Sequence, residues 1–252
     1  METAVNGSTG SVVRIFPDIH ALSHAAADTF RSLAGMAVSN RGRFAAALSG
    51  GSAPKGLYTL LAERPYSDQI EWERVHLFWA DERCVPPEHV DSNFKLVHEL
   101  LLSRVAIPDK NIHRIKGERG AERAAEDYEQ YLRAFFGDED FPALDLVILG
   151  VGEDGHTASL FPGSPQVMEH NRLAAPVFPG NQKKGRVTLT LPVLNHAKQV
   201  LFLVSGLSKQ KIIRSILQDG NPDELPAGLV HLVTGSSSWY LDEDAASQLP
   251  QR

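Results

Sequence analysis

Cysteine is almost missing from this chain: Cys84 is the only one among 252 residues, so no disulfide can form within the chain. A zinc site built from several thiolates is excluded for the same reason. No hydrophobic run approaches the roughly 20 residues that a membrane-spanning helix needs, and residues 1–10 lack the basic and apolar regions of a secretory signal. We therefore expect a protein of a reducing compartment, the cytoplasm, without membrane contact.

Positive charge is also scarce. The 25 Lys and Arg residues are outnumbered by 31 Asp and Glu residues, which gives a formal net charge of -6. A nucleic-acid-binding protein that relies on bulk attraction to phosphates needs the opposite balance. We therefore expect no nucleic-acid partner. A small anionic ligand remains possible if local basic side chains and backbone N–H groups bind it.

Several motifs with known chemistry are absent. The sequence has no His-Glu-x-x-His of a zinc hydrolase, no Gly-x-Ser-x-Gly nucleophile and no Gly-Lys-Ser/Thr of a P-loop. The run Gly150-x-Gly152-x-x-Gly155 matches a dinucleotide fingerprint, but Glu153 and Asp154 within it would repel a pyrophosphate. We expect neither a metal nor a cofactor.

Strand and helix patterns alternate along the chain, which predicts an α/β fold with a mostly parallel, Rossmann-like sheet and helices on both faces. No composition shift marks a boundary, so we expect a single domain over residues 1–252, with residues 1–10 as a flexible tail and 163–185 irregular. The predicted strands are 12–16, 43–48, 75–80, 144–149, 187–191, 200–204 and 229–233, and the predicted helices are 19–36, 55–62, 93–105, 120–136 and 208–217.

The loop after the apolar run 144–149 carries Glu153, Asp154 and His156. Ligands of open α/β sheets bind in the loops at the carboxyl ends of the strands. Because an imidazole titrates near neutral pH, His156 is the best candidate for an acid–base residue, and either carboxylate could orient its ring. The alternative is a histidine that caps a helix beside two solvated acids.

Two strand-to-helix turns suit an anion. The Ser49-Gly50-Gly51-Ser52 turn precedes a helix that starts near Pro54, so its N–H groups and hydroxyls could bind a phosphate. The alternative is an ordinary serine-capped turn. Lys209 lies near a later helix start, where an anion would offset its unfavourable position, although it could also be a plain surface lysine.

Asp81-Glu82-Arg83 follows the predicted strand 75–80 and should reach the same edge of the sheet as His156. Arg83 could bind a carboxylate, a phosphate or a sugar oxygen. The alternative is a solvated loop in which Asp81 caps a turn, but an apolar run that ends abruptly in three charges at the ligand edge disfavours it. Arg186, at the start of a later strand, is a weaker candidate for the anion site.

Taken in this order, these segments resemble the 6-phosphogluconolactonase family over nearly the whole chain. The Gly-Glu-Asp-Gly-His segment is shared with the related glucosamine-6-phosphate isomerases and deaminases. Two features favour the lactonases. Where this chain has Arg83, the deaminases carry a residue that looks like tyrosine, and where it has the Ser159–Pro162 segment, they carry a segment with a further catalytic glutamate. The matching stretches are 47–52, 78–83, 150–162, 186–190, 205–209 and 239–242.

The resemblance implies an open three-layer α/β sandwich that binds no dinucleotide and hydrolyses 6-phospho-D-glucono-1,5-lactone in the oxidative pentose phosphate pathway, without metal or cofactor. The alternatives are a sugar-phosphate isomerase or deaminase that uses Asp81 as a carbon base, and a non-catalytic sugar-phosphate sensor. We expect a monomer or weak homodimer. The expected catalytic residues are His156, Asp154, Glu153, Arg83 and Asp81, and the expected substrate- and phosphate-binding residues are Ser49, Gly50, Gly51, Ser52, Lys209 and Arg186.

Overall fold

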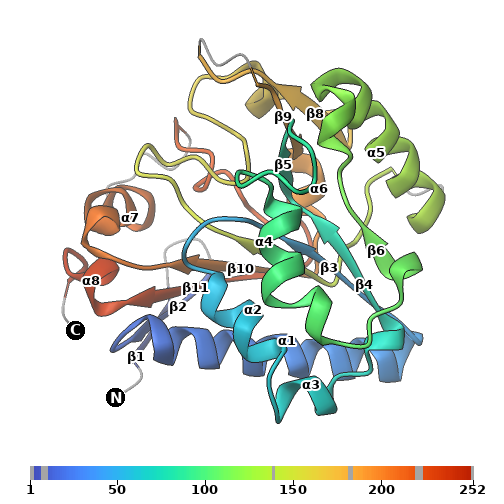
Figure 1. The fold of residues 1–252 in the computed structure, drawn as a ribbon. Coiled ribbons are helices and arrows are strands. Elements are labelled where there is room, and N and C mark those ends of the chain that lie inside the picture. Colours follow the sequence, from blue (N-terminus) through green and yellow to red (C-terminus); the bar gives the residue numbers. More distant parts are fainter. Residues whose placement is uncertain (1–2, 7–10, 138–139, 181–183, 219–223, 251–252) are drawn as a thin grey trace.

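The computed structural model describes residues 3–6, 11–137, 140–180, 184–218 and 224–250. Within them, a central sheet of eight strands is parallel throughout except for its first pair (Figure 1). The spatial order is β1 (Thr3–Asn6), β2 (Val12–Phe16), β11 (Ser236–Asp242), β10 (Gln199–Val204), β7 (Leu146–Leu149), β3 (Phe44–Leu48), β4 (Val75–Trp79) and β6 (Ile112–His113).

Helices cover this sheet, which confirms the predicted α/β class. The longest, α1 (Ile19–Arg41), starts where the Asp18 side chain accepts a hydrogen bond from the N–H of Ala21, and ends at Gly42, whose φ of 73° is left-handed. It lies along the bottom of the view in Figure 1. The other helices are α2 (Lys55–Leu61), α3 (Tyr66–Gln69), α4 (Asn93–Leu100), α5 (Ala121–Phe136), α6 (Leu191–Asn195), α7 (Gln210–Leu217) and α8 (Glu243–Ala246).

A small second sheet lies at the top of Figure 1, where α5 packs against it. Its three strands are antiparallel, in the order β5 (Asp81–Arg83), β9 (Arg186–Leu189) and β8 (Ala174–Val177). The predicted strand 187–191 therefore belongs to this sheet rather than to the parallel one. The expectation that 163–185 is irregular is wrong for β8.

Complete burial explains why the central strands can be predicted from the sequence. Every residue of β3 and β7 is buried, because helices and neighbouring strands cover both faces, and such strands are continuous apolar runs. The strands β10, β7, β3 and β4 are consecutive neighbours and parallel. Their carboxyl ends therefore meet at one edge, and so do the loops that follow them.

Several elements differ from the predictions, beginning with the helix predicted at 19–36, which continues to Arg41 as α1. No strand covers 229–233; the last strand is β11, whose first three residues are serines and mask the pattern. Thr3–Asn6, expected in a flexible tail, pair with β2 as β1, whereas 1–2 and 7–10 lie outside the described residues. The predicted helix 93–105 ends at Leu100 and continues as a separate 3-10 turn at Leu102–Arg104.

Candidate active site

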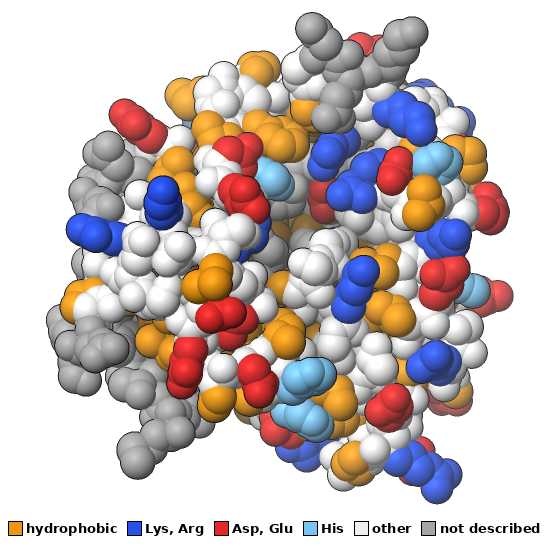
Figure 2. Space-filling model, turned by 60° about the vertical axis from the view of Figure 1, so that its left-hand side comes forward, with side chains coloured by type: hydrophobic (Ala, Val, Ile, Leu, Met, Phe, Trp, Pro, Cys, Tyr) orange, Lys and Arg blue, Asp and Glu red, His pale blue; other side chains and the backbone are white. Residues whose placement is uncertain are grey.

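A cavity of about 220 Å³ opens at the carboxyl ends of β3, β7 and β10, beside β5. Nine of the eleven predicted site residues line it, and the two that do not are Glu153 and Asp154. The face drawn in Figure 2 is hollowed near its centre, with a histidine and acidic side chains on one rim and basic side chains on the opposite rim. The lining residues named by the sequence are Ser49, Gly50, Gly51, Ser52, Asp81, Arg83, His156, Arg186 and Lys209.

His156 is held by one of the two candidate carboxylates, Asp154. The Asp154 Oδ1 atom lies 2.6 Å from His156 Nδ1 and also accepts the backbone N–H of His156 at 3.2 Å. Partial burial raises the pKa of Asp154, but these hydrogen bonds outweigh it and leave the pKa below its usual value. Because the ionised carboxylate accepts the Nδ1 proton, Nε2 is the ring nitrogen left for chemistry. Glu153 is exposed and lies outside the cavity lining.

Gly152 has no room for a side chain. A Cβ atom there would lie 2.0 Å from His156 Nδ1 and 2.5 Å from Asp154 Oδ1. The Gly152 N–H donates to the His156 carbonyl at 2.8 Å, which closes the loop around the histidine. Gly155 completes the turn with a left-handed φ of 84°. These glycines therefore serve a tight histidine–aspartate loop rather than a dinucleotide.

Asp81 is a fixed anion in the cavity wall. It lies on β5, is 5% exposed, and accepts hydrogen bonds from Ser159 Oγ at 2.6 Å and Asn93 Nδ2 at 3.1 Å. Asn93 also lines the cavity, although it is not among the residues expected from the sequence. The signal was ambiguous, because Ser92-Asn93 reads as the start of a helix, and Ser92 does cap α4.

Arg83 and Arg186 face each other as partners in the β5–β9 ladder. Arg83 Nη1 donates to the Asp91 carbonyl at 2.7 Å, whereas its Nε is buried without a partner among the described residues. Burial and the neighbouring Arg83 lower the pKa of Arg186, and Asp81 and Asp91 only partly oppose this. Two crowded guanidinium groups in a cavity wall favour an anionic ligand. The sequence does not reveal this pairing, which brings Arg186 into the cavity lining beside Arg83.

The glycine turn offers backbone donors. Among the described residues, the N–H groups of Gly50, Gly51 and Ser52 have no hydrogen-bond acceptor, and all three residues line the cavity in front of α2. The Ser49 hydroxyl differs from expectation, since it donates to the Ile148 carbonyl at 2.7 Å and has no proton left for a ligand.

Lys209 approaches the same cavity from the turn after β10. Asp242, at the end of β11, accepts the Gly206 N–H at 3.0 Å and the hydroxyl proton of Ser205. The buried Asp242 carboxylate therefore fixes the turn that carries Lys209. The described residues include no group of three or more His, Cys, Asp or Glu side chains that could hold a metal ion. None of their helices is long and apolar enough to span a membrane.

Residues 17–239 match the family described as glucosamine-6-phosphate isomerases/6-phosphogluconolactonase. The chain belongs to this family. The rat 6-phosphogluconolactonase is 44% identical over 214 residues, which cover 83% of this chain and 82% of the relative. The 6-phosphogluconolactonase of Synechocystis is 40% identical over 218 residues, covering 84% and 88%.

Solved structures of the family agree with the fold. The 6-phosphogluconolactonase of Trypanosoma brucei is 29% identical with a TM-score of 0.87, covering 96% of this chain and 100% of that one. A structure named devB protein is 37% identical with a TM-score of 0.86, covering 94% and 99%. A monomeric glucosamine-6-phosphate deaminase, 19% identical with a TM-score of 0.78 over 94% and 99%, shares the fold.

Proposed function

We propose that this chain hydrolyses 6-phospho-D-glucono-1,5-lactone to 6-phosphogluconate, a step of the oxidative pentose phosphate pathway. The observation that carries the proposal is the 2.6 Å contact between His156 Nδ1 and Asp154 at a cavity lined by basic side chains. This pairs a poised general base with an anion site, which is what a phosphorylated ester substrate requires. The names of the relatives point to the same reaction.

The 6-phosphate binds to the glycine turn. The N–H groups of Gly50, Gly51 and Ser52, which no described residue accepts, donate to its oxygens, and the positive end of α2 adds favourable potential. Lys209, which lines the same cavity, supplies a positive charge for the phosphate. Binding at this end orients the ring, so that part of the binding energy goes into placing the lactone carbonyl near His156.

His156 acts as the general base. Its Nε2 takes a proton from a water molecule as the water oxygen attacks C1 of the lactone, and Asp154 stabilises the imidazolium that forms. The tetrahedral intermediate then collapses, the bond between C1 and the ring oxygen breaks, and the imidazolium returns its proton to that oxygen. A positioned base of this kind contributes typically about 10²–10⁴-fold in rate.

Arg83 and Arg186 stabilise the negative charge that develops on the carbonyl oxygen. Each well-placed donor in such a role is worth about 3–4 kcal/mol of transition-state stabilisation. The same guanidinium groups then bind the carboxylate of the product. Asp81, held by Asn93 and Ser159, forms an acceptor for sugar hydroxyl groups in the same wall.

The test follows acid release from freshly made 6-phosphogluconolactone, with buffer alone as the baseline because the lactone also opens in water. His156→Ala should lose about 10²–10⁴-fold in turnover while it still binds 6-phosphogluconate by calorimetry. Near-normal turnover of this variant would remove the base assignment. Glucosamine 6-phosphate serves as the control substrate, because ammonia release from it would favour the deaminase alternative, and binding without turnover of either would favour a sensor.

Three further expectations belong to this proposal. A cytoplasmic location and a monomeric or weakly dimeric state stay predictions from the sequence, as does the single domain. Light scattering over a range of protein concentrations measures the oligomeric state, and a stable higher oligomer would contradict the expectation.

A further inference from the structure

Glu82 is a buried carboxylate that the reaction described above does not use. It lies on β5 between Asp81 and Arg83, is 3% exposed, and does not line the cavity. Its Oε1 atom accepts the backbone N–H groups of Arg83 at 2.8 Å and Asn93 at 2.7 Å. Its Oε2 atom accepts the N–H of Phe94 at 2.7 Å and the Ser92 hydroxyl at 3.0 Å. Each carboxylate oxygen therefore serves two donors.

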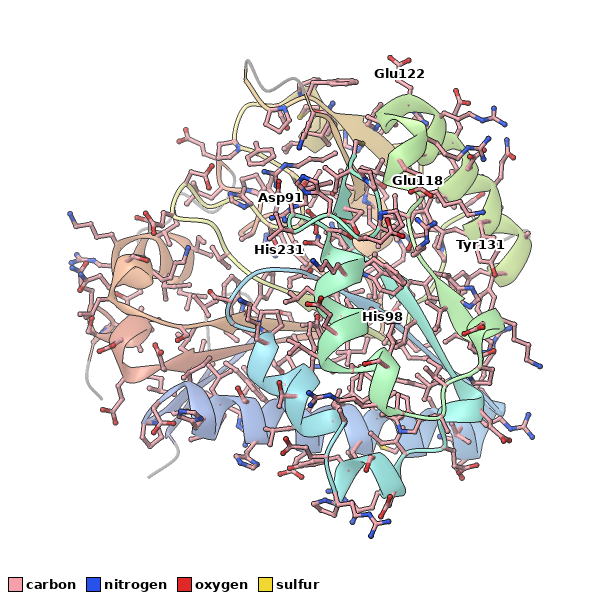
Figure 3. All side chains as sticks on the ribbon, in the orientation of Figure 1. Asp91, His98, Glu118, Glu122, Tyr131 and His231 are labelled. Carbon is pink, nitrogen blue, oxygen red and sulfur yellow. The ribbon has the colours of Figure 1, made fainter. Side chains whose placement is uncertain are left out.

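These hydrogen bonds join β5 to the start of α4. The Arg83 guanidinium adds a bond to the carbonyl of Asp91, which lies on the segment leading into α4 and is labelled in Figure 3. Asn93, whose N–H is fixed by Glu82, donates its carboxamide Nδ2 to the Asp81 carbonyl at 2.9 Å and to the Asp81 carboxylate at 3.1 Å. One carboxylate thus fixes the backbone of two cavity-lining residues, Arg83 and Asn93.

The network also reaches the glycine turn. A Cβ atom on Gly50 would lie 1.9 Å from the Asn93 Oδ1 atom, so the carboxamide packs directly on the turn proposed to bind phosphate. A displacement of Asn93 would therefore disturb the glycine turn and Asp81 together. Arg83 would shift with them, because its N–H is bound to the same Oε1 atom.

Helix capping alone does not account for this arrangement. The Ser92 hydroxyl already caps α4 by accepting the N–H of Lys95 at 3.2 Å. Burial of Glu82 raises its pKa, which the bonds from Asn93, Phe94 and Arg83 counter only in part. Burying a carboxylate costs free energy, and α4 is a two-turn helix that Ser92 already caps. The buried Glu82 side chain is therefore better explained by the residues whose positions it fixes.

We propose that Glu82 is a positioning residue for lactone hydrolysis, which sets Arg83 and Asn93 in the cavity wall through the two N–H groups on its Oε1 atom. The proposal rests on the proposed function of the cavity. It assigns Glu82 no contact with the substrate.

Glu82→Gln tests it. The substitution keeps the shape but replaces one carboxylate oxygen by an amide NH₂, so that one pair of donors must face another donor. We expect kcat/KM for 6-phosphogluconolactone to fall about 10- to 100-fold, with contributions from both kcat and KM. We also expect the affinity for 6-phosphogluconate, measured by calorimetry, to weaken in a chain that remains folded by circular dichroism.

Ser92→Ala is the matched control. It removes one donor to Oε2 and the α4 cap but leaves both N–H groups on Oε1, so it should lower the thermal midpoint while kcat and KM stay within about twofold. A Glu82→Gln variant that loses stability but keeps the wild-type kcat and KM would overturn the proposal, because a merely structural role predicts that result.

If Glu82→Gln does not fold, Asn93→Ala tests the proposal instead. With Glu82 intact, the proposal expects at least a tenfold loss of kcat/KM, and unchanged activity would overturn it. The activity of the wild-type chain distinguishes a failure of this proposal from a failure of the proposed function. A wild type without lactonase activity refutes the function itself, whereas an active wild type with an equally active Glu82→Gln variant refutes only the role of Glu82.

Discussion

Gly152→Ala should strongly impair the enzyme through one added methyl group. The new Cβ would lie 2.0 Å from His156 Nδ1 and 2.2 Å from Cε1, far inside the distance of about 3.5–4 Å at which non-bonded carbon atoms normally pack. The imidazole must therefore move by more than about 1 Å, and the 2.6 Å bond to Asp154 must break or stretch. A displacement of that size at a reacting group costs about 10²-fold in rate.

The loss should appear in kcat rather than in binding. The phosphate donors on the glycine turn are not touched by this methyl group, so the affinity for 6-phosphogluconate should change little. Acid release under saturating lactone measures kcat, and calorimetry measures the affinity. Overpacking of this kind costs about 1–3 kcal/mol of stability, so urea titration must first confirm that the variant is folded under assay conditions.

Gly150→Ala is the matched control, two residues earlier in the same loop. A Cβ there meets no atom of the described residues within 4 Å, and the φ of Gly150 lies outside the left-handed region. The same methyl group should therefore cost far less activity. A Gly152→Ala variant with wild-type kcat, or one that loses no more than Gly150→Ala, would refute the view that the His156–Asp154 pair must sit against this glycine.

Three further predictions use other parts of the site and the fold. Lys209→Ala should raise KM for the phosphorylated lactone at least tenfold, whereas equal weakening toward unphosphorylated gluconolactone would show that Lys209 does not bind the phosphate. Arg186→Gln should lower kcat/KM for the lactone about tenfold or more without lowering the free energy of unfolding in urea, because it removes repulsion from Arg83; a marked loss of stability would contradict the crowding argument. Burial, followed by the nearby His76, lowers the pKa of His113 to about 4, so the folded state resists a proton that the unfolded chain accepts near pH 6.5. The free energy of unfolding should therefore fall by about 2 kcal/mol between pH 7 and pH 5 from this group, and an equal pH dependence in His113→Leu would contradict that assignment.

The sequence was sufficient to predict which loops meet. The apolar strands 44–48 and 146–149 are readable because both their faces are buried, and parallel neighbours must end at one edge. That rule agrees with the placement of Lys209 and the glycine turn at one cavity, which the family resemblance also implies. The order and direction of the strands therefore account for most of what the sequence predicts correctly.

The curvature of the loops and the pairing between short strands cannot be predicted from the sequence. Glu153 and Asp154 are adjacent and chemically alike, and only the turn at Gly155 decides that Asp154 reaches the imidazole. Arg186 comes to lie beside Arg83 through the antiparallel pairing of β5 with β9, which leaves no periodic signal in strands of three and four residues. The last strand was misplaced because its serines interrupt the apolar pattern.

The Ser159–Pro162 segment, whose sequence favours a lactonase over a deaminase, also helps to hold Asp81 in a role that suits a lactonase. Ser159 belongs to this segment, and its hydroxyl binds Asp81 Oδ2 at 2.6 Å while Asn93 binds Oδ1. Both carboxylate oxygens of Asp81 therefore already accept a hydrogen bond from a neighbouring side chain, whereas a carbon base must turn one oxygen toward the substrate carbon. The wall that holds Asp81 therefore favours a fixed acceptor for substrate hydroxyl groups, and in the proposed reaction the proton transfer belongs to His156.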